Sequence, residues 1–165
     1  MRIFTFCAVA LAATSPVFAQ TLDEILAPRP DTAACWHRTY SDAHLAKHPQ
    51  QKVTAVDFYL DYYEMDHDEA GKGSYSFSID FTTRERKGGA GGLCQQGAQG
   101  KVTCGGDCDS GALTIRNSGT KGSLLVELLS GGMTLTDCEE DAPYYMSAEP
   151  DDKVFLVHPV ACPAD

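Results

Sequence analysis

The chain has 165 residues, of which 43% are hydrophobic and 22% charged, and its 13 Lys and Arg against 23 Asp and Glu give a formal net charge of −10. This composition is typical of one globular domain and is too apolar for a disordered chain. A surface of this charge repels the phosphates of nucleic acids and anionic lipids, so we expect no nucleic-acid partner. A basic protein, a cationic ligand or a divalent metal is favoured instead, although acidic surfaces also keep exported proteins soluble.

Residues 1–19 predict a secretory signal peptide. Arg2 supplies the positive start, residues 3–13 form an apolar run, and residues 17–19 (Val-Phe-Ala) match a small-residue cleavage pattern. Removal of this segment would leave 12 basic and 23 acidic residues, because the segment holds one base and no acid. We therefore expect export to the periplasm or the cell exterior. No apolar run after residue 19 approaches the length of a membrane span, so we expect no transmembrane segment in the mature chain.

The cysteines that come after the expected signal peptide indicate disulfide bonds. Their even number and the oxidising destination favour three disulfides. Sequence alone does not choose among the ways of pairing them, but a bond between Cys35 and Cys162 would tie the two ends of the mature chain together. The six cysteines are Cys35, Cys94, Cys104, Cys108, Cys138 and Cys162.

Residues 20–50 predict a helical or irregular N-terminal cap. Thr21 and Glu24 form a capping box at the start of a short helix. A second short helix is expected to begin at Ser41 and to end near His48, because the proline that follows disfavours helical geometry in the residue before it.

Strict alternation of apolar and polar residues then predicts two strands, 55–63 and 74–81, each with one buried face. Acidic and glycine-rich residues from Glu64 to Gly73 predict a turn, so the two strands should pair as an antiparallel hairpin. The side chains expected to be buried are Val56, Phe58, Leu60, Tyr62, Tyr75, Phe77, Ile79 and Phe81.

The second half of the chain predicts further short strands. Turn residues at 117–122 and 130–132 separate three of them. The segment 87–111 holds nine glycines and three cysteines with little apolar content, so we expect cross-links to hold it in place. The predicted strands are Lys101–Cys104, Leu113–Arg116, Ser123–Leu129, Met133–Asp137 and Lys153–Val157.

These elements predict an all-β fold, an antiparallel β-sandwich or small β-barrel with a short helical N-terminal segment and disulfide bracing. The alternation of strands and helices that marks a parallel sheet is missing from the sequence. Residues 51–165 would be the β-domain, forming one globular unit with residues 20–50.

Tyrosines interleaved with carboxylates suggest a ligand-binding surface. If the apolar side of the first strand is buried, the opposite side carries two aspartates and two tyrosines. Another tyrosine pair, Tyr144 and Tyr145, lies in a predicted loop between two acidic clusters. Such a surface suits a cationic partner through charge, hydrogen bonds and cation–π contacts. In the alternative interpretation these tyrosines pack against a second sheet or a helix. The strand residues are Asp57, Tyr59, Asp61 and Tyr63.

Two motifs indicate an alternative metal site. His44 and His48 lie four residues apart and would share one face of a helix, where they could hold one metal ion. Asp107 and Asp109 offer two carboxylates in a flexible loop, enough for calcium. The ordinary interpretations are exposed histidines on a polar helix and a solvated acidic turn.

Cys104 and Cys108 have a Cys-x3-Cys spacing that can bind a soft metal or form a redox-active disulfide. Structural disulfides to other cysteines are favoured over this interpretation. No Gly-x-Ser-x-Gly elbow or other catalytic set stands out, so a binding protein is favoured over an enzyme. We expect a non-enzymatic binding module of the cell envelope for a basic protein or cationic ligand, with no cofactor. The alternative is a periplasmic metal-handling or redox protein with a divalent metal.

Overall fold

Nine antiparallel strands build the described part of the protein, and eight of them close into a barrel. The computed structural model describes residues 21–64, 73–97, 101–136 and 142–163. The sheet order is β6-β5-β4-β3-β2-β1-β9-β7, and pairing of β6 with β7 closes the ring. The strands are β1 (Thr32–Thr39), β2 (Val53–Glu64), β3 (Gly73–Thr83), β4 (Lys87–Gln96), β5 (Val102–Gly106), β6 (Gly111–Asn117), β7 (Leu124–Leu135), β8 (Tyr144–Met146) and β9 (Val154–Val160). The prediction of an all-β antiparallel fold is therefore confirmed, in the form of a small barrel.

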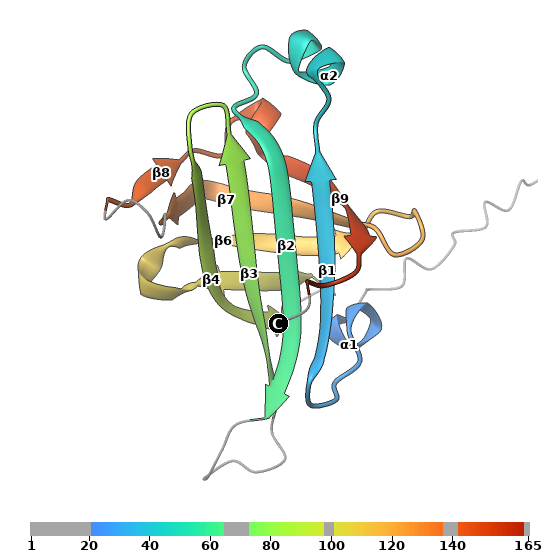
Figure 1. The fold of residues 1–165 in the computed structure, drawn as a ribbon. Helices are drawn as coiled ribbons and strands as arrows, with labels where there is room; N and C mark the ends of the chain where they lie inside the picture. Colours follow the sequence, from blue (N-terminus) through green and yellow to red (C-terminus); the bar gives the residue numbers. More distant parts are fainter. Residues whose placement is uncertain (1–20, 65–72, 98–100, 137–141, 164–165) are drawn as a thin grey trace, which may run out of the picture.

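Two walls of strands cross in the barrel. β1, β2 and β3 run upright at the front, and β6 and β7 pass behind them (Figure 1). β7 pairs with β9 through residues 124–127 and with β8 through residues 133–135. The short strand β8 is therefore the extra strand beside the closed ring.

The predicted hairpin is the front of this barrel. β2 and β3 pair antiparallel from Glu64 opposite Gly73 back to Val53 opposite Thr83. Their apolar residues point inward, as the alternation predicts, because an eight-stranded barrel has an interior just wide enough for side chains to fill. The buried interior includes Val56, Phe58, Leu60, Phe77, Ile79, Phe81, Val102, Leu113, Ile115, Leu124, Val126, Leu128, Met133, Leu135, Phe155 and Val157.

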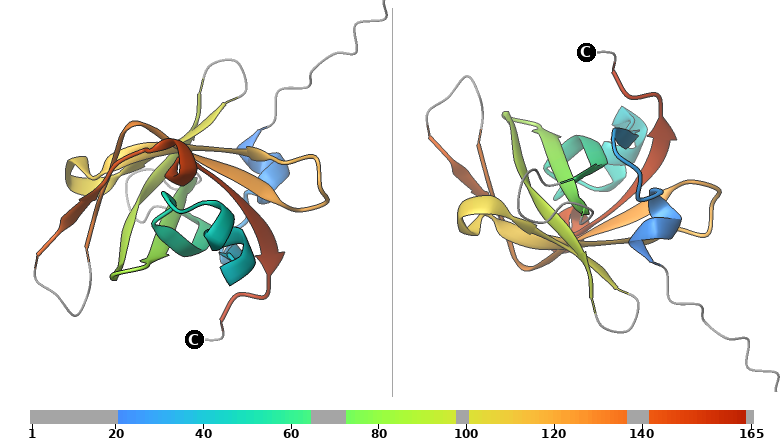
Figure 2. Two further views of the ribbon diagram at one scale, coloured as in Figure 1. Left: turned by 90° about the horizontal axis from the view of Figure 1, so that it is seen from above. Right: turned by 90° about the horizontal axis from the view of Figure 1, so that it is seen from below.

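Short helices lie at the two ends of the barrel. α1 (Leu22–Ile25) has the predicted capping box and lies nearer the viewer in the view from below, whereas α2 (Asp42–Lys47) lies nearer in the view from above (Figure 2). The Leu22 side chain is buried. The hydroxyl of Tyr75 shares its single proton between two acceptors, the carboxylate of Asp23 in α1 at 2.8 Å and the carbonyl oxygen of Leu26 at 2.9 Å. The Ser41 hydroxyl caps α2 by accepting the His44 amide, which confirms the predicted start of that helix. None of the helices in the described ranges is long and apolar enough to cross a membrane.

The N-terminal segment differs from its sequence expectation. Residues 32–39, expected to be helical or irregular, form β1, which pairs with both β2 and β9. Trp36 is its one large apolar side chain, 5% exposed, and its indole N–H donates to the carbonyl of Gly122 at 2.7 Å. One aromatic residue among alanines and polar residues gives a weak alternation. Hydrogen bonding to β2 on one side and to β9 on the other stabilises β1, although its own sequence pattern favours a strand only weakly.

The glycine-rich segment also differs, because its glycines allow close strand contacts. Residues 87–96 form the unpredicted strand β4, which packs tightly against both neighbours, whereas the strand predicted at 101–104 is present as β5 at 102–106. A Cβ on Gly92 would lie 2.1 Å from the carbonyl oxygen of Gly105. Likewise, residues 130–132 are not a turn but part of β7, where a Cβ on Gly132 would lie 2.2 Å from the carbonyl oxygen of Met146. Both glycines permit a close backbone approach that any side chain would block.

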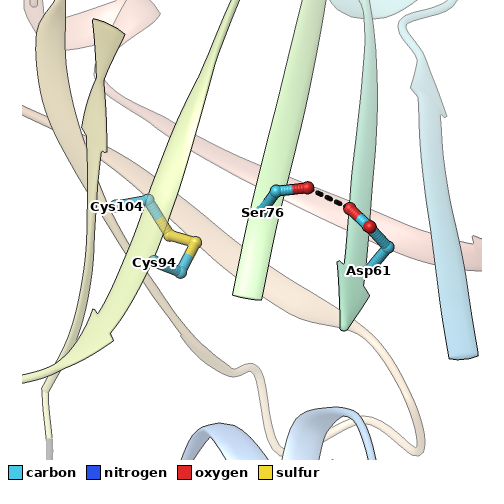
Figure 3. The surroundings of a disulfide bond; sticks show 4 residues. All are labelled: Asp61, Ser76, Cys94 and Cys104. Carbon is cyan, nitrogen blue, oxygen red and sulfur yellow. Dashed lines mark hydrogen bonds between the residues drawn. A yellow bond between two sulfur atoms is a disulfide. The ribbon is translucent and has the colours of Figure 1, made fainter. Parts of the chain in front are cut away.

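Two disulfides brace the barrel. The predicted bond between Cys35 and Cys162 is present and spans 127 residues. A second bond joins Cys94 on β4 to Cys104 on β5, directly opposite in the strand register (Figure 3). Cys108 is exposed and bonds to no cysteine within the described ranges. Cys138 lies outside these ranges, so the third disulfide stays a prediction.

Loss of the long-range disulfide should destabilise the barrel more than loss of the local one. In the loop-entropy account, C35A/C162A should lower the free energy of unfolding by about 4–5 kcal/mol and C94A/C104A by about 3 kcal/mol. The longer loop in the first case gives the unfolded chain more freedom when it is released. Urea unfolding of both double variants measures the difference. A larger loss for C94A/C104A would show that packing of the buried cysteines outweighs loop closure.

Candidate functional site

A groove runs over the outside of β1, β2 and β3. It has a volume of about 550 Å³, and the segment after β9 forms one of its walls. The Cys35–Cys162 disulfide fastens that segment to β1. The groove is lined by Cys35, Trp36, His37, Asp57, Phe58, Tyr59, Ser78, Asp80, Val160, Ala161 and Pro163. Of the residues predicted to bind a ligand, Asp57 and Tyr59 lie in it.

Three titratable side chains stand in one row across this groove. Strand register places His37 opposite Asp57 and Asp57 opposite Asp80, so one residue comes from each of β1, β2 and β3. The His37 Nδ1 atom lies 2.7 Å from Asp57 Oδ1, and its Nε2 atom lies 2.7 Å from the Thr39 hydroxyl. The imidazole is thus held at both nitrogens. Among the described residues, the hydrogen-bond partner of the Asp57 side chain lies on the β1 side of its strand.

The other neighbour of Asp57 is a second carboxylate. Partial burial raises the pKa of Asp80, and the negative charge of Asp57 raises it further. The carboxylate of Asp80 lies over Gly89 of β4, where an added Cβ would fall 2.2 Å from Asp80 Oδ1. Like charges directly opposite on neighbouring strands destabilise a sheet. The fold therefore holds two carboxylates on directly opposite positions of neighbouring strands, where their repulsion costs stability.

The next row of the groove is neutral. Tyr59 lies between Cys35 and Ser78 in the strand register and is 37% exposed. Its ring and the Ser78 hydroxyl stand beside the two carboxylates. Val160 and Pro163 supply apolar surface across the groove. The site thus combines negative charge, an aromatic ring and an apolar wall within a few side-chain lengths.

Asp61 and Tyr63 continue the same outer face of β2 beyond the groove. Asp61 accepts a hydrogen bond from the Ser76 hydroxyl on β3, a pair drawn beside the Cys94–Cys104 disulfide in Figure 3. Tyr63 is 36% exposed. The structure therefore has both aspartates and both tyrosines of β2 on the outer face of the barrel, as the alternation predicts.

Tyr144 and Tyr145 do not join that face. They lie in β8, not in the predicted loop, and line a separate pocket with the basic residues Lys52, Arg84 and Arg86. The acidic cluster expected before them, residues 137–141, lies outside the described ranges. The part of the surroundings that the structure describes is basic, because Arg86 of the turn between β3 and β4 packs on Tyr144 of β8.

The histidine pair of α2 has a stacked geometry. The rings of His44 and His48 lie 4.4 Å apart between centroids, and His44 Nε2 bonds to the Gln51 side chain at 3.0 Å. Asp107 and Asp109 flank the exposed Cys108 in a short turn. Among the residues that the structure describes, no group of three or more His, Cys, Asp and Glu is arranged to hold a metal ion. The metal site at these four positions stays a prediction.

Cys104 is unavailable to Cys108 in this structure. It is fully buried and bonded to Cys94, which agrees with the structural interpretation of the Cys-x3-Cys spacing.

Sequence reasoning missed His37, Ser78 and Asp80, although one signal was present for the last. If Glu64 pairs with Gly73 at the predicted turn, then the residues seven positions away from the turn on each strand, Asp57 and Asp80, lie opposite each other. The observed register is this one. His37 and the C-terminal wall gave no such signal, because β1 itself was not predicted.

Comparison of the chain with protein-family models, with curated proteins and with solved structures finds no match.

Replacement of Asp80 by Asn should stabilise the protein at neutral pH. The folded-state pKa of Asp80 is raised, so its ionised form is disfavoured by folding, and this penalty is complete only above that pKa. We expect D80N to raise the free energy of unfolding at pH 7 by about a few tenths of a kcal/mol, because solvent screens an exposed carboxylate. The gain should disappear as the pH falls and Asp80 becomes protonated in both states. Urea unfolding at a series of pH values, with E64Q at the far end of β2 as control, measures it. An unchanged or lower stability of D80N at pH 7 would contradict the account.

Proposed function

We propose that this protein is a non-enzymatic binding module that takes a cationic side chain, lysine or arginine, of a basic protein into the groove on β1–β3. The observation that carries the proposal is the pair Asp57 and Asp80, held opposite each other at the groove with the pKa of Asp80 raised. Strained titratable groups that gather in a cleft are a common mark of a binding or catalytic site.

A bound cation would relieve the strain between the two carboxylates. One ammonium or guanidinium group placed between Asp57 and Asp80 would meet both, and its charge would offset their repulsion. Its binding would bring the pKa of Asp80 back toward the ordinary carboxylate range. His37 already holds one oxygen of Asp57, so the second oxygen of Asp57 and the Asp80 carboxylate are the natural acceptors.

The remaining walls suit the rest of such a side chain. The ring of Tyr59 can contact the cation through its π face. The carbon stem of lysine or arginine can lie along apolar surface while its charged head stays at the carboxylates, and Val160 and Pro163 offer that surface. The net charge of −10 would speed the approach of a basic partner.

The cellular setting of the proposal is the cell envelope. Two disulfides fit an oxidising compartment, which agrees with export after cleavage of residues 1–19. The bond from Cys35 to Cys162 also holds a groove wall, so oxidation and binding would be linked.

A lysine-rich peptide should bind wild-type protein and lose affinity when the carboxylate pair is neutralised. The probe is a short Lys-Gly repeat peptide, compared with a Ser-Gly peptide of equal length, by calorimetry at low and moderate salt. D57N and D80N should each weaken binding about tenfold or more, since each removes a charge-assisted hydrogen bond. D61N should have a smaller effect, because Asp61 lies outside the groove.

The matched control is E64Q, which removes one negative charge from the same strand without touching the groove. Equal losses in E64Q and D57N would show that only net charge matters and would exclude the groove as the site. Binding of the lysine peptide that is unchanged in both D57N and D80N would contradict the proposal.

A further inference from the structure

We infer that a second site, formed by the turn between β3 and β4 together with β8, binds a small phosphate or carboxylate group attached to an apolar body. The pocket has a volume of about 350 Å³ and lies on another part of the surface from the acidic groove, with which it shares no lining residue. Figure 1 shows β8 at the same end of the barrel as the turn between β3 and β4. The inference is independent of the proposed function, because it rests on different residues.

Arg86 is held in position for an anion. Its guanidinium carbon lies 3.6 Å above the centroid of the Tyr144 ring, which is stacking contact. A stacked guanidinium keeps its N–H groups in its own plane, directed past the edge of the ring, in the fork that suits two oxygens of one anion. Tyr144 is fixed in turn by Gly88, where an added Cβ would fall 2.6 Å from a ring carbon.

Two further cations line the same pocket. Hydrogen bonds fix the side chain of one and the backbone of the other. Arg84 donates from Nε to the carbonyl of Gln51 at 2.8 Å, which anchors its guanidinium at the barrel end. The backbone N–H of Lys52 donates to the buried carboxylate of Asp152 at 2.7 Å. Within the described part of the chain, the pocket lining has one acid, Glu85, against three bases.

The concentration of positive charge here is unusual for this chain. Three of its 13 Lys and Arg residues line one pocket, although acids outnumber bases by 23 to 13 overall. Like charges that line one pocket repel one another, and an oxyanion bound among them would lower that repulsion. The same physical argument that assigns a cation to the acidic groove therefore assigns an anion to this pocket.

The pocket is also lined by aromatic and apolar residues of β8, which suit a ligand larger than a bare ion. Tyr145 is 61% exposed, and its hydroxyl donates to the carbonyl of Gly131, which fixes the ring. Met146, the next residue of β8, also lines the pocket but is only 5% exposed. An exposed ring held rigid next to an anion site is suited to stack on an apolar or aromatic part of the same ligand. The chemical class is thus an aryl or alkyl phosphate or carboxylate.

The test compares three probes on the full-length mature protein: phenyl phosphate, inorganic phosphate and benzoate. We expect phenyl phosphate and benzoate to bind more tightly than inorganic phosphate, because they place a ring on Tyr145. R86Q should weaken binding of phenyl phosphate at least about tenfold. R86K, which keeps the charge and loses the flat fork, should lie between R86Q and wild type. Calorimetry gives the affinities, and thermal melting confirms that each variant folds.

K87Q is the matched control, because Lys87 is the next residue in the chain, carries the same charge and is not part of the pocket lining. It should change the affinity less than about twofold, since screened charge at a distance contributes little. D57N should leave binding unchanged, which separates this site from the acidic groove. Equal loss in K87Q and R86Q would overturn the inference, as would failure of all three probes to bind folded wild-type protein.

Discussion

The register of β2 against β3 is the constraint on which the groove depends. Both strands bury one face in a closed barrel, so a slip of one residue would turn Phe58 and Ile79 outward and is strongly disfavoured. The same register places Asp57 opposite Asp80. The burial of the core therefore supplies the energy that holds two carboxylates together on the outer surface. A cationic ligand that binds between the two carboxylates would relieve their repulsion, and this relief would favour its binding.

Because side chains fill the barrel interior, the two proposed sites lie on its outside. One is the acidic groove on the front wall, and the other is the basic pocket where β8 meets the turn between β3 and β4. Each depends on a segment added to the simple ring of strands. The tail after β9 makes a wall of the groove, and β8 makes a wall of the pocket. Close glycine contacts, at Gly89 beneath Asp80 and at Gly88 beneath Tyr144, set the position of a side chain in each site.

Sequence predicted the parts of the fold that have a strong local signal. Alternation over β2 and β3 and the caps of α1 and α2 are local properties, and the Cys35–Cys162 pairing followed from the positions of the two ends. β1 and β4 were missed because their stability comes from neighbouring strands. For the site, Asp57 and Tyr59 were predicted from strand sidedness. His37 and Asp80 were not, since strand pairing rather than local pattern brings them to the groove.

The most direct test of this account is the pKa of Asp80, measured by carbon-13 NMR titration of its carboxyl with and without saturating lysine-rich peptide. Burial and the charge of Asp57 raise this pKa in the free protein. An ammonium group seated between the two carboxylates would favour the ionised form, so the account predicts a fall in the pKa on binding. A pKa of Asp80 that stays raised while the peptide is bound would show that the cation does not enter the groove, and would contradict the central claim.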